Sequence, residues 1–151
     1  MAPTMTIFCL IFLLSTTVDL HPVGAWRPTL MEIDRFCLAY IVHVMNGLSN
    51  NNHPLLLQCH SRDDDLGNHT LYIGGDFHFG FGIKIFGKHT LFNCGMEWGN
   101  KHHNFDVFNQ DVHASICCTH HGRSCFWRAQ DDGIYFSTDN EEWAKTFPWI
   151  E

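Results

Sequence analysis

A cysteine on the apolar side of an alternating segment is the feature that most constrains this chain. The segment TLFNCGMEW, residues 90–98, has the two-residue period of a β-strand. One of its faces carries Phe92, Cys94, Met96 and Trp98. The segments 54–61 and 124–129 repeat this arrangement around Cys59 and Cys125. Three separated strands that each turn a cysteine inward predict a sheet core held by disulfide bonds.

The start of the chain predicts an export signal. Residues 7–14, IFCLIFLL, are an unbroken apolar run, and residues 23–25 are small enough for a signal peptidase. The run is too short for a membrane span, which needs about 20 residues in a helix. We therefore expect residues 1–25 to be a signal peptide cleaved after Ala25, and the product to be secreted and extracellular without membrane insertion. The alternative is a buried N-terminal helix of a cytosolic domain.

The expected product is one small acidic domain, residues 26–151. Once Asp19 is removed with the signal, nine Lys and Arg residues stand against fifteen Asp and Glu residues, a net charge of −6 with histidine neutral. Nucleic acids are bound through clustered Lys and Arg, so we expect no nucleic-acid partner.

Six cysteines remain after cleavage, an even number in an exported chain, and they predict a disulfide framework. They are Cys37, Cys59, Cys94, Cys117, Cys118 and Cys125. A zinc site is the alternative, because three of these cysteines surround His120 and His121, but the paired C-x2-C spacing of zinc ligands is absent.

The sequence narrows the disulfide pairing without fixing it. Cys59 and Cys94 both face the core and would close a ring of 36 residues, which stabilises by about 4 kcal/mol in the chain-entropy model. Cys118 and Cys125 flank the polar segment THHGRS and would close a smaller ring, with a contribution of about 2.5 kcal/mol. Cross-pairing of the same four cysteines stays open.

Short segments of strand character follow one another along the chain. In 76–87, one face carries Phe77, Phe79, Phe81, Ile83 and Ile85, all expected in the core. Residues 37–46 are apolar on both faces, which predicts a central strand covered on both sides. Further strands are expected at 55–60, 71–73, 105–108, 112–118, 125–130 and 134–137, with a histidine-rich turn at 100–104 and a tail, 141–149, that covers an open end of the core.

No segment indicates a helix of normal length. About eight short strands separated by turn residues predict an all-β fold, a small antiparallel β-sandwich or a barrel stabilised by disulfides. Residues 62–68, RDDDLGN, are expected to form a solvated acidic loop, because they lack the spacing of a calcium loop. The sequon Asn68-His69-Thr70 at its end makes Asn68 a glycosylation candidate in a secreted glycoprotein.

We expect no catalytic, cofactor-binding or metal-binding residues. The sequence contains no nucleophile elbow, H-E-x-x-H or phosphate-binding glycine loop. Glu97 and Asp106 are the alternative, as a carboxylate pair for glycoside hydrolysis. A second alternative is that histidines gather on one edge to bind a metal or to sense pH, namely His102, His103, His113, His120 and His121.

The order and spacing of several motifs resemble the plant self-incompatibility S-protein homologue family over residues 40–149. These motifs are Val42-x-Val44-x-Asn46-x-Leu48, LQCHSRDDDLG at 57–67, TLFNC at 90–94, FDVF at 105–108, and Cys118 through CFW at 125–127 to DGIY at 132–135. The resemblance implies a small secreted plant protein with a β-sandwich fold that acts as an extracellular signal. It also places the family's four cysteines on Cys59, Cys94, Cys118 and Cys125, while Cys37 and Cys117 depart from the pattern and their state stays open.

The function we expect is extracellular recognition by a monomeric protein that is not an enzyme. Polar loops of varied charge would be presented to a cell-surface receptor, at residues 47–53, 62–68, 99–104 and 119–124. The alternatives are a secreted defence or metal-binding protein and a cell-wall glycan-active enzyme.

Overall fold

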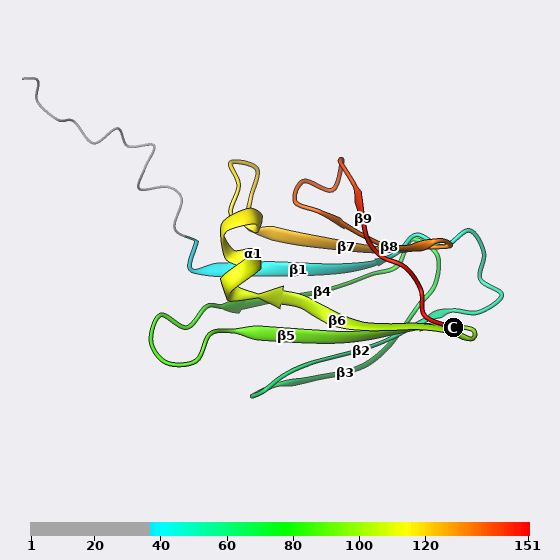
Figure 1. The fold of residues 1–151 in the computed structure, drawn as a ribbon, viewed down its shortest axis with the longest axis horizontal. Helices are drawn as coiled ribbons and strands as arrows, with labels where there is room; N and C mark the ends of the chain where they lie inside the picture. Colours follow the sequence, from blue (N-terminus) through cyan, green and yellow to red (C-terminus); the bar gives the residue numbers. More distant parts are fainter. Residues whose placement is uncertain (1–36) are drawn as a thin grey trace, which may run out of the picture.

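The computed structural model describes residues 37–151, so the expected signal peptide lies outside the described residues. Within this range, nine strands and one short helix form two packed sheets (Figure 1). The elements are β1 (Ala39–Asn46), β2 (Leu55–Ser61), β3 (Asp65–Leu71), β4 (Asp76–Gly82), β5 (Leu91–Trp98), β6 (Lys101–Asn109), α1 (Gln110–Cys117), β7 (Ser124–Gln130), β8 (Gly133–Ser137) and β9 (Ala144–Phe147). One sheet has the order β4-β1-β7-β8-β9 and the other β3-β2-β5-β6. The expected all-β sandwich is confirmed.

One pair of neighbouring strands is parallel. β1 and β7 run in the same direction, with Val42 opposite Cys125 and Val44 opposite Trp127, whereas the other paired strands among residues 37–151 are antiparallel. Parallel neighbours need a crossover connection and not a tight hairpin. Here the connection from β1 to β7 consists of the strands β2 to β6 and the helix α1 (Figure 1).

The core lies between the sheets and is filled from alternating positions on both. Trp127 of β7 is the largest fully buried side chain, and its indole N–H donates a 2.9 Å hydrogen bond to the carbonyl oxygen of Val107 on β6. This bond satisfies the polar atom of the residue and ties one sheet to the other. Each large apolar side chain buried in this way contributes roughly 1.5–3 kcal/mol before entropy is subtracted.

The five-stranded sheet is covered on one face only, which corrects two expectations. Ile41 of β1 is 42% exposed and His43 is half-buried, so β1 is not covered on both sides. β4 is an edge strand that ends at Gly82, and its three phenylalanines are half-buried against the core. Ile85 lies beyond the end of β4 and is 61% exposed, so its expected place in the core is wrong.

The segment expected to form a strand at 112–118 forms the helix α1 instead. The side chain of Asn109 caps the helix by accepting a 3.0 Å hydrogen bond from the backbone N–H of Asp111. The two buried residues of the helix, His113 and Cys117, are four positions apart and therefore share a helical face. The cap and this spacing outweigh the β-propensity of Val112 and Ile116.

Three loop boundaries also differ from expectation. The histidine-rich segment expected as a turn belongs to β6, and the turn before it is confined to Gly99 and Asn100, where Gly99 has a φ of 62°. Most of the expected acidic loop at 62–68 belongs to β3, which pairs with β2 through Asn68 opposite Gln58. The strand expected at 71–73 is the end of β3 followed by a turn.

The C-terminal tail covers one end of the core, as expected. Phe147 and Trp149 pack against the buried cluster, and the Trp149 indole donates a 2.8 Å hydrogen bond to the carbonyl oxygen of Gln130. Ile150 forms a β-bridge with His102, which places the C-terminus beside the start of β6 (Figure 1). In residues 37–151, no helix has the length and apolar character needed to cross a membrane.

Candidate recognition surface

Three disulfide bonds brace the sandwich. Cys59 of β2 lies directly opposite Cys94 of β5 and is bonded to it, with the Cα atoms 4.1 Å apart. The other two bonds are Cys117–Cys125 and Cys37–Cys118. The pairing of Cys118 with Cys125 considered from the sequence is therefore wrong. Cys37 and Cys117 each bond to one of the cysteines of that expected pair.

The helix α1 explains why adjacent cysteines have different partners. Cys117 is fully buried in the last turn of α1 and faces Cys125, which is fully buried on β7. Cys118 follows as the C-cap with non-helical backbone angles, and its side chain reaches Cys37 just before β1. All six cysteines of residues 37–151 are thus in disulfide bonds, so they are not zinc ligands.

The histidines considered as a cluster are not brought together. His102 is exposed on β6, whereas the half-buried ring of its neighbour His103 stacks on Phe147 at 4.9 Å. His113 is buried in α1, and the pair His120–His121 is exposed in the loop before β7.

His113 has a structural role. Its Nδ1 atom accepts a 2.8 Å hydrogen bond from the backbone N–H of Asn109, so the free N–H of a neutral ring is on Nε2. The ring packs near Phe108, Trp127 and Phe136. Burial lowers the pKa of His113, although the contact with Asn109 and the charge of Asp106 partly oppose this shift.

Glu97 and Asp106 do not form a pair suited to glycoside hydrolysis. In the β5–β6 ladder Glu97 lies opposite His102, and Asp106 lies opposite Asn93. The two carboxylates are therefore four positions apart along the ladder, or about 13 Å at about 3.3 Å per residue. Glycosidases place their two carboxyl groups roughly 5–9.5 Å apart.

The expected recognition loops lie at opposite ends of the sandwich. Residues 47–53 and the turn at 99–100 lie at the end that holds the C-terminus (Figure 1). The side chain of Asp131 holds the loop 47–53 in place, because it accepts a 2.9 Å hydrogen bond from the backbone N–H of Ser49. The turn at 62–64 and the segment 119–123 lie at the other end of the sandwich, which also holds α1 (Figure 1).

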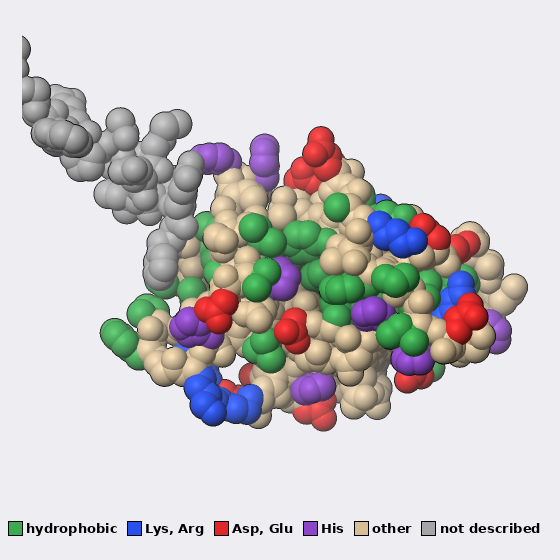
Figure 2. Space-filling view, in the orientation of Figure 1, with side chains coloured by type: hydrophobic (Ala, Val, Ile, Leu, Met, Phe, Trp, Pro, Cys, Tyr) green, Lys and Arg blue, Asp and Glu red, His purple; other side chains and the backbone are tan. Residues whose placement is uncertain are grey.

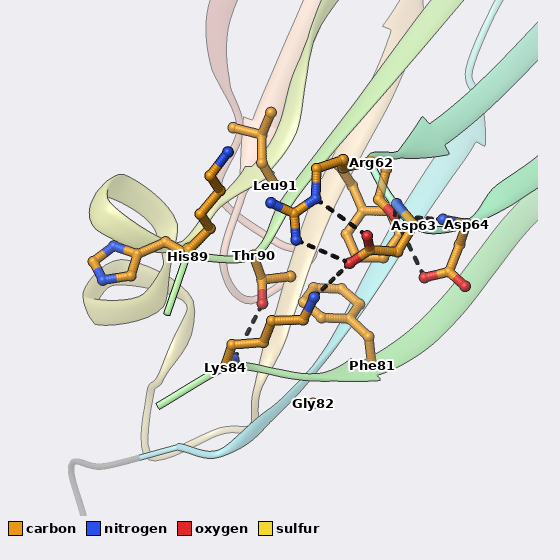
Figure 3. A pocket seen from close by; sticks show the side chains of 12 residues that line it. Arg62, Asp63, Asp64, Phe81, Gly82, Lys84, His89, Thr90 and Leu91 are labelled. Atoms are coloured by element: carbon orange, nitrogen blue, oxygen red, sulfur yellow. Dashed lines mark hydrogen bonds and ion pairs between the residues drawn. The ribbon is translucent and has the colours of Figure 1, made fainter. Parts of the chain in front are cut away.

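A pocket of about 270 Å³ opens at the α1 end, between the turn at 62–64 and the β4–β5 loop, residues 83–90 (Figure 3). Phe81, Leu91 and Phe92 supply apolar lining. Polar and charged side chains complete it, including Arg62, Asp63, Asp64, Lys84, Lys88 and His89. An apolar lining with a few charged groups at its edge is typical of a small binding site.

A carboxylate between two cations links the two segments of this pocket. Arg62 and Lys84 both point toward Asp63 in Figure 3, and the Arg62 Nε atom donates a 3.1 Å hydrogen bond to it. The hydrogen bonds from Arg62 and then from Lys84 lower the pKa of Asp63 to about 2. Asp63 therefore stays ionised well below the physiological pH range.

The β4–β5 loop is also held to the helix. Gln110, at the start of α1, accepts a 2.9 Å hydrogen bond from the backbone N–H of Thr90 and donates one of 3.1 Å to the carbonyl oxygen of Lys84. His89 bonds to Asp111 in the first turn of the helix. The base of the loop is therefore fixed while its tip extends into solvent.

Large apolar side chains are exposed at this end of the molecule. Phe86 at the loop tip is 90% exposed, and Ile85 beside it is 61% exposed. Leu91, Val112 and Ile116 are each more than 40% exposed on the neighbouring β5 and α1. Figure 2 shows hydrophobic side chains at the loop tip and around the helix. We call these five residues, together with the charged side chains lining the pocket, the α1-end surface.

Sequence reasoning missed the loop tip because it extended β4 through Ile85. The available signal was the adjacent apolar pair Ile85-Phe86, which breaks the two-residue period, followed by Gly87. Gly87 has a φ of 93°, which suits glycine and ends an extended strand.

Asn68, the glycosylation candidate, is exposed on β3 at the edge of its sheet.

A two-sheet sandwich with three internal disulfides and a single short helix in residues 37–151 defines a small disulfide-stabilised β-sandwich protein. The family described as plant self-incompatibility protein S1 matches residues 41–149, so the chain belongs to this family. The resemblance seen in the sequence is confirmed, and the chain is a member of a group of small secreted plant proteins.

Individual relatives agree with this assignment. S-protein homolog 2 of Arabidopsis thaliana is 34% identical over 111 residues, which cover 72% of this chain and 66%, just under two thirds, of that protein. S-protein homolog 24 of the same plant is 31% identical over 95% of this chain and 92% of its own length. These homologues are not known as enzymes.

A solved structure shares the fold. It belongs to the self-incompatibility protein homologues, described as a widespread family of small, highly stable, secreted proteins from plants. The match has a TM-score of 0.55 at 18% identity and covers 76% of this chain and 97% of that structure.

Proposed function

We propose that this protein is a secreted recognition ligand that binds a cell-surface receptor protein through the α1-end surface. The observation that carries the proposal is the exposure of Phe86 and Ile85 at the tip of a loop whose base is fixed. Single exposed apolar residues are common, but an adjacent pair with three further apolar side chains at the same end of the molecule is typical of a contact surface.

The chemistry around the loop tip suits a protein partner. Interfaces bind most strongly through a few aromatic or aliphatic anchors surrounded by polar groups that exclude water. Phe86 is such an anchor, and Lys88 supplies positive charge two residues further along the same loop, whereas Arg62 and Lys84 in the adjoining pocket are paired with Asp63. We infer a receptor whose complementary site holds an apolar pocket next to acidic side chains.

The disulfide frame supports this role energetically. Cys117–Cys125 joins the end of α1 to β7, and Cys37–Cys118 joins the next residue to the start of β1. A surface held in its binding conformation before contact loses less entropy on association. The proposed ligand acts as a monomer and not as an enzyme, because its buried side chains serve packing and its cysteines are bonded to one another.

Proximity labelling tests the proposal. The chain without residues 1–25, fused to a labelling enzyme, is applied to intact plant cells with and without an excess of the unfused chain. The proposal predicts that the same surface protein is labelled repeatedly and that the excess chain abolishes its labelling. If no surface protein is labelled, or if the excess of unfused chain does not reduce the labelling, the receptor role is contradicted.

A further inference from the structure

A group of potential metal ligands lies on the open face of the five-stranded sheet, away from the α1-end surface. His43 on β1 and His78 on β4 are directly opposite each other in the antiparallel ladder. Asp76 lies two residues before His78 and therefore on the same face of β4. One ligand atom from each of the three residues lies within 4.8 Å of the others.

The carboxylate of Asp76 is shared by the two imidazoles. Its Oδ2 atom is 2.8 Å from Nδ1 of His43 and 3.5 Å from Nδ1 of His78. In a tetrahedral zinc site with bonds of about 2.0–2.1 Å, neighbouring ligand atoms are about 3.3 Å apart. The two distances bracket this value, and the ligand atoms of the two imidazoles lie within 4.8 Å of each other, so side-chain rotations bring all three atoms to one ion.

The surrounding side chains hold the first ligand in place. The ring of His43 stacks on Phe126 of the neighbouring strand β7 at 4.7 Å, and on His78 at 5.2 Å. The side chain of His43 is only 20% exposed, whereas that of His78 is 62% exposed. One ligand is thus fixed by packing, and the other is open to solvent, which gives an ion a path to the site.

The nearest cation of the adjacent strand has other partners. Arg128 of β7 lies opposite Met45, two residues beyond His43 on β1. Its guanidinium stacks on the ring of Trp143 at 3.9 Å and bonds to Asn140 at 3.2 Å. These contacts fix the position of the guanidinium, which keeps its positive charge.

We propose that His43, Asp76 and His78 bind one zinc ion, with water in the open fourth position. Two imidazole nitrogens and one carboxylate oxygen are a ligand set that suits zinc, and three protein ligands with an open position are a known zinc geometry. The proposal does not depend on the receptor role. It differs from the histidine clusters considered from the sequence, because only the β1–β4 register joins residues 33 positions apart.

Isothermal titration of the oxidised chain without residues 1–25 with zinc chloride tests the site. The expected result is one zinc ion per chain. His78→Gln and Asp76→Asn should each weaken zinc binding at least tenfold, and both changes are at partly exposed positions that the fold tolerates. The matched control is His120→Gln, which alters an exposed histidine in the loop before β7 and should leave the affinity unchanged.

A second readout reports on the ligands themselves. In NMR spectra, zinc should shift the imidazole signals of His43 and His78 and not those of His120 or His121. Circular dichroism spectra of the variants that match the parent establish that each is folded. The proposal is overturned if no zinc binds, if binding is unchanged in His78→Gln, or if it is lost only when His120 is replaced.

Discussion

Cys117, the last residue of α1, is bonded to Cys125 on β7, although Cys118 lies one residue nearer to Cys125 in the sequence. This bond fixes the end of the helix, and through it the α1-end surface, to the parallel strand pair β1–β7. It also leaves Cys118 to bond with Cys37. Two successive residues are therefore bonded to different segments, one to β7 and the other to the segment just before β1.

Single cysteine replacements distinguish this pairing from the alternative. Cys117→Ser should free the thiol of Cys125, whereas Cys118→Ser should free that of Cys37. Alkylation of the folded variants followed by trypsin and mass spectrometry locates the free thiol, because the tryptic peptide 124–128 contains Cys125 as its one cysteine. Alkylated Cys125 in Cys118→Ser would contradict the pairing.

The Cys59–Cys94 bond should contribute more stability than Cys117–Cys125. It closes a longer ring, so the chain-entropy model assigns it about 4 kcal/mol against about 2.5 kcal/mol. We expect the double variant Cys59→Ala/Cys94→Ala to lose more free energy of unfolding in urea than Cys117→Ala/Cys125→Ala. Equal losses in the two variants would show that native-state packing, and not ring size, sets the contribution.

His113 should make the fold less stable in acid. Its pKa is lowered in the folded protein by burial, whereas an unfolded imidazole titrates near pH ~6.5. The unfolded chain therefore binds the proton first as the pH falls. The stability that the neutral ring contributes is present above about pH 6.5 and is lost as the pH falls through the lower folded-state pKa.

The variant His113→Gln keeps a hydrogen-bond acceptor for Asn109 and removes this titration. Between about pH 6.5 and the folded-state pKa, its free energy of unfolding should fall less steeply, by up to about 1.4 kcal/mol per pH unit. Urea unfolding across this range measures the slope, and His121→Gln, at an exposed position, is the control. An unchanged slope in His113→Gln would assign the acid sensitivity to other groups.

Asn68 should carry an N-linked glycan when the chain is secreted from plant cells. Its side chain is exposed on the edge strand β3, where a glycan has room. Asn68→Gln should remove the glycan mass in intact-protein mass spectrometry, and Asn104→Gln, an exposed asparagine outside any sequon, should not. A parent protein without added mass would show that the sequon is not used.

The sequence predicted the fold where one face of a strand meets solvent and the other meets the core. The alternation around Cys59, Cys94 and Cys125 correctly predicted β2, β5 and β7, because a two-residue period indicates a half-buried strand. It failed at 112–118, where the decisive features are the Asn109 cap and the spacing of His113 and Cys117. The wrong partner for Cys125 followed from that error.

The residues of the two proposed sites were harder to predict because they depend on contacts between distant segments. The β4–β5 loop becomes a projecting tip only when Gln110 and Asp63 fix its base, and neither contact has a local sequence signal. The proximity of His43 to Asp76 likewise depends on strand register. The four polar loops chosen from composition therefore do not include the apolar loop tip of the proposed recognition surface.

Saturation binding of the fluorescently labelled chain to intact plant cells tests the receptor role of the α1-end surface most directly. Ile85→Ser/Phe86→Ser removes the apolar loop tip, and Tyr72→Ser/Ile73→Ser removes an exposed apolar pair at the opposite end of the sandwich as the matched control. We predict saturable binding by the parent and the control, and at least tenfold weaker binding by the loop-tip variant, a loss of about 1.4 kcal/mol or more. Equal binding by both variants, or a loss confined to the variant at residues 72 and 73, would contradict the proposed surface.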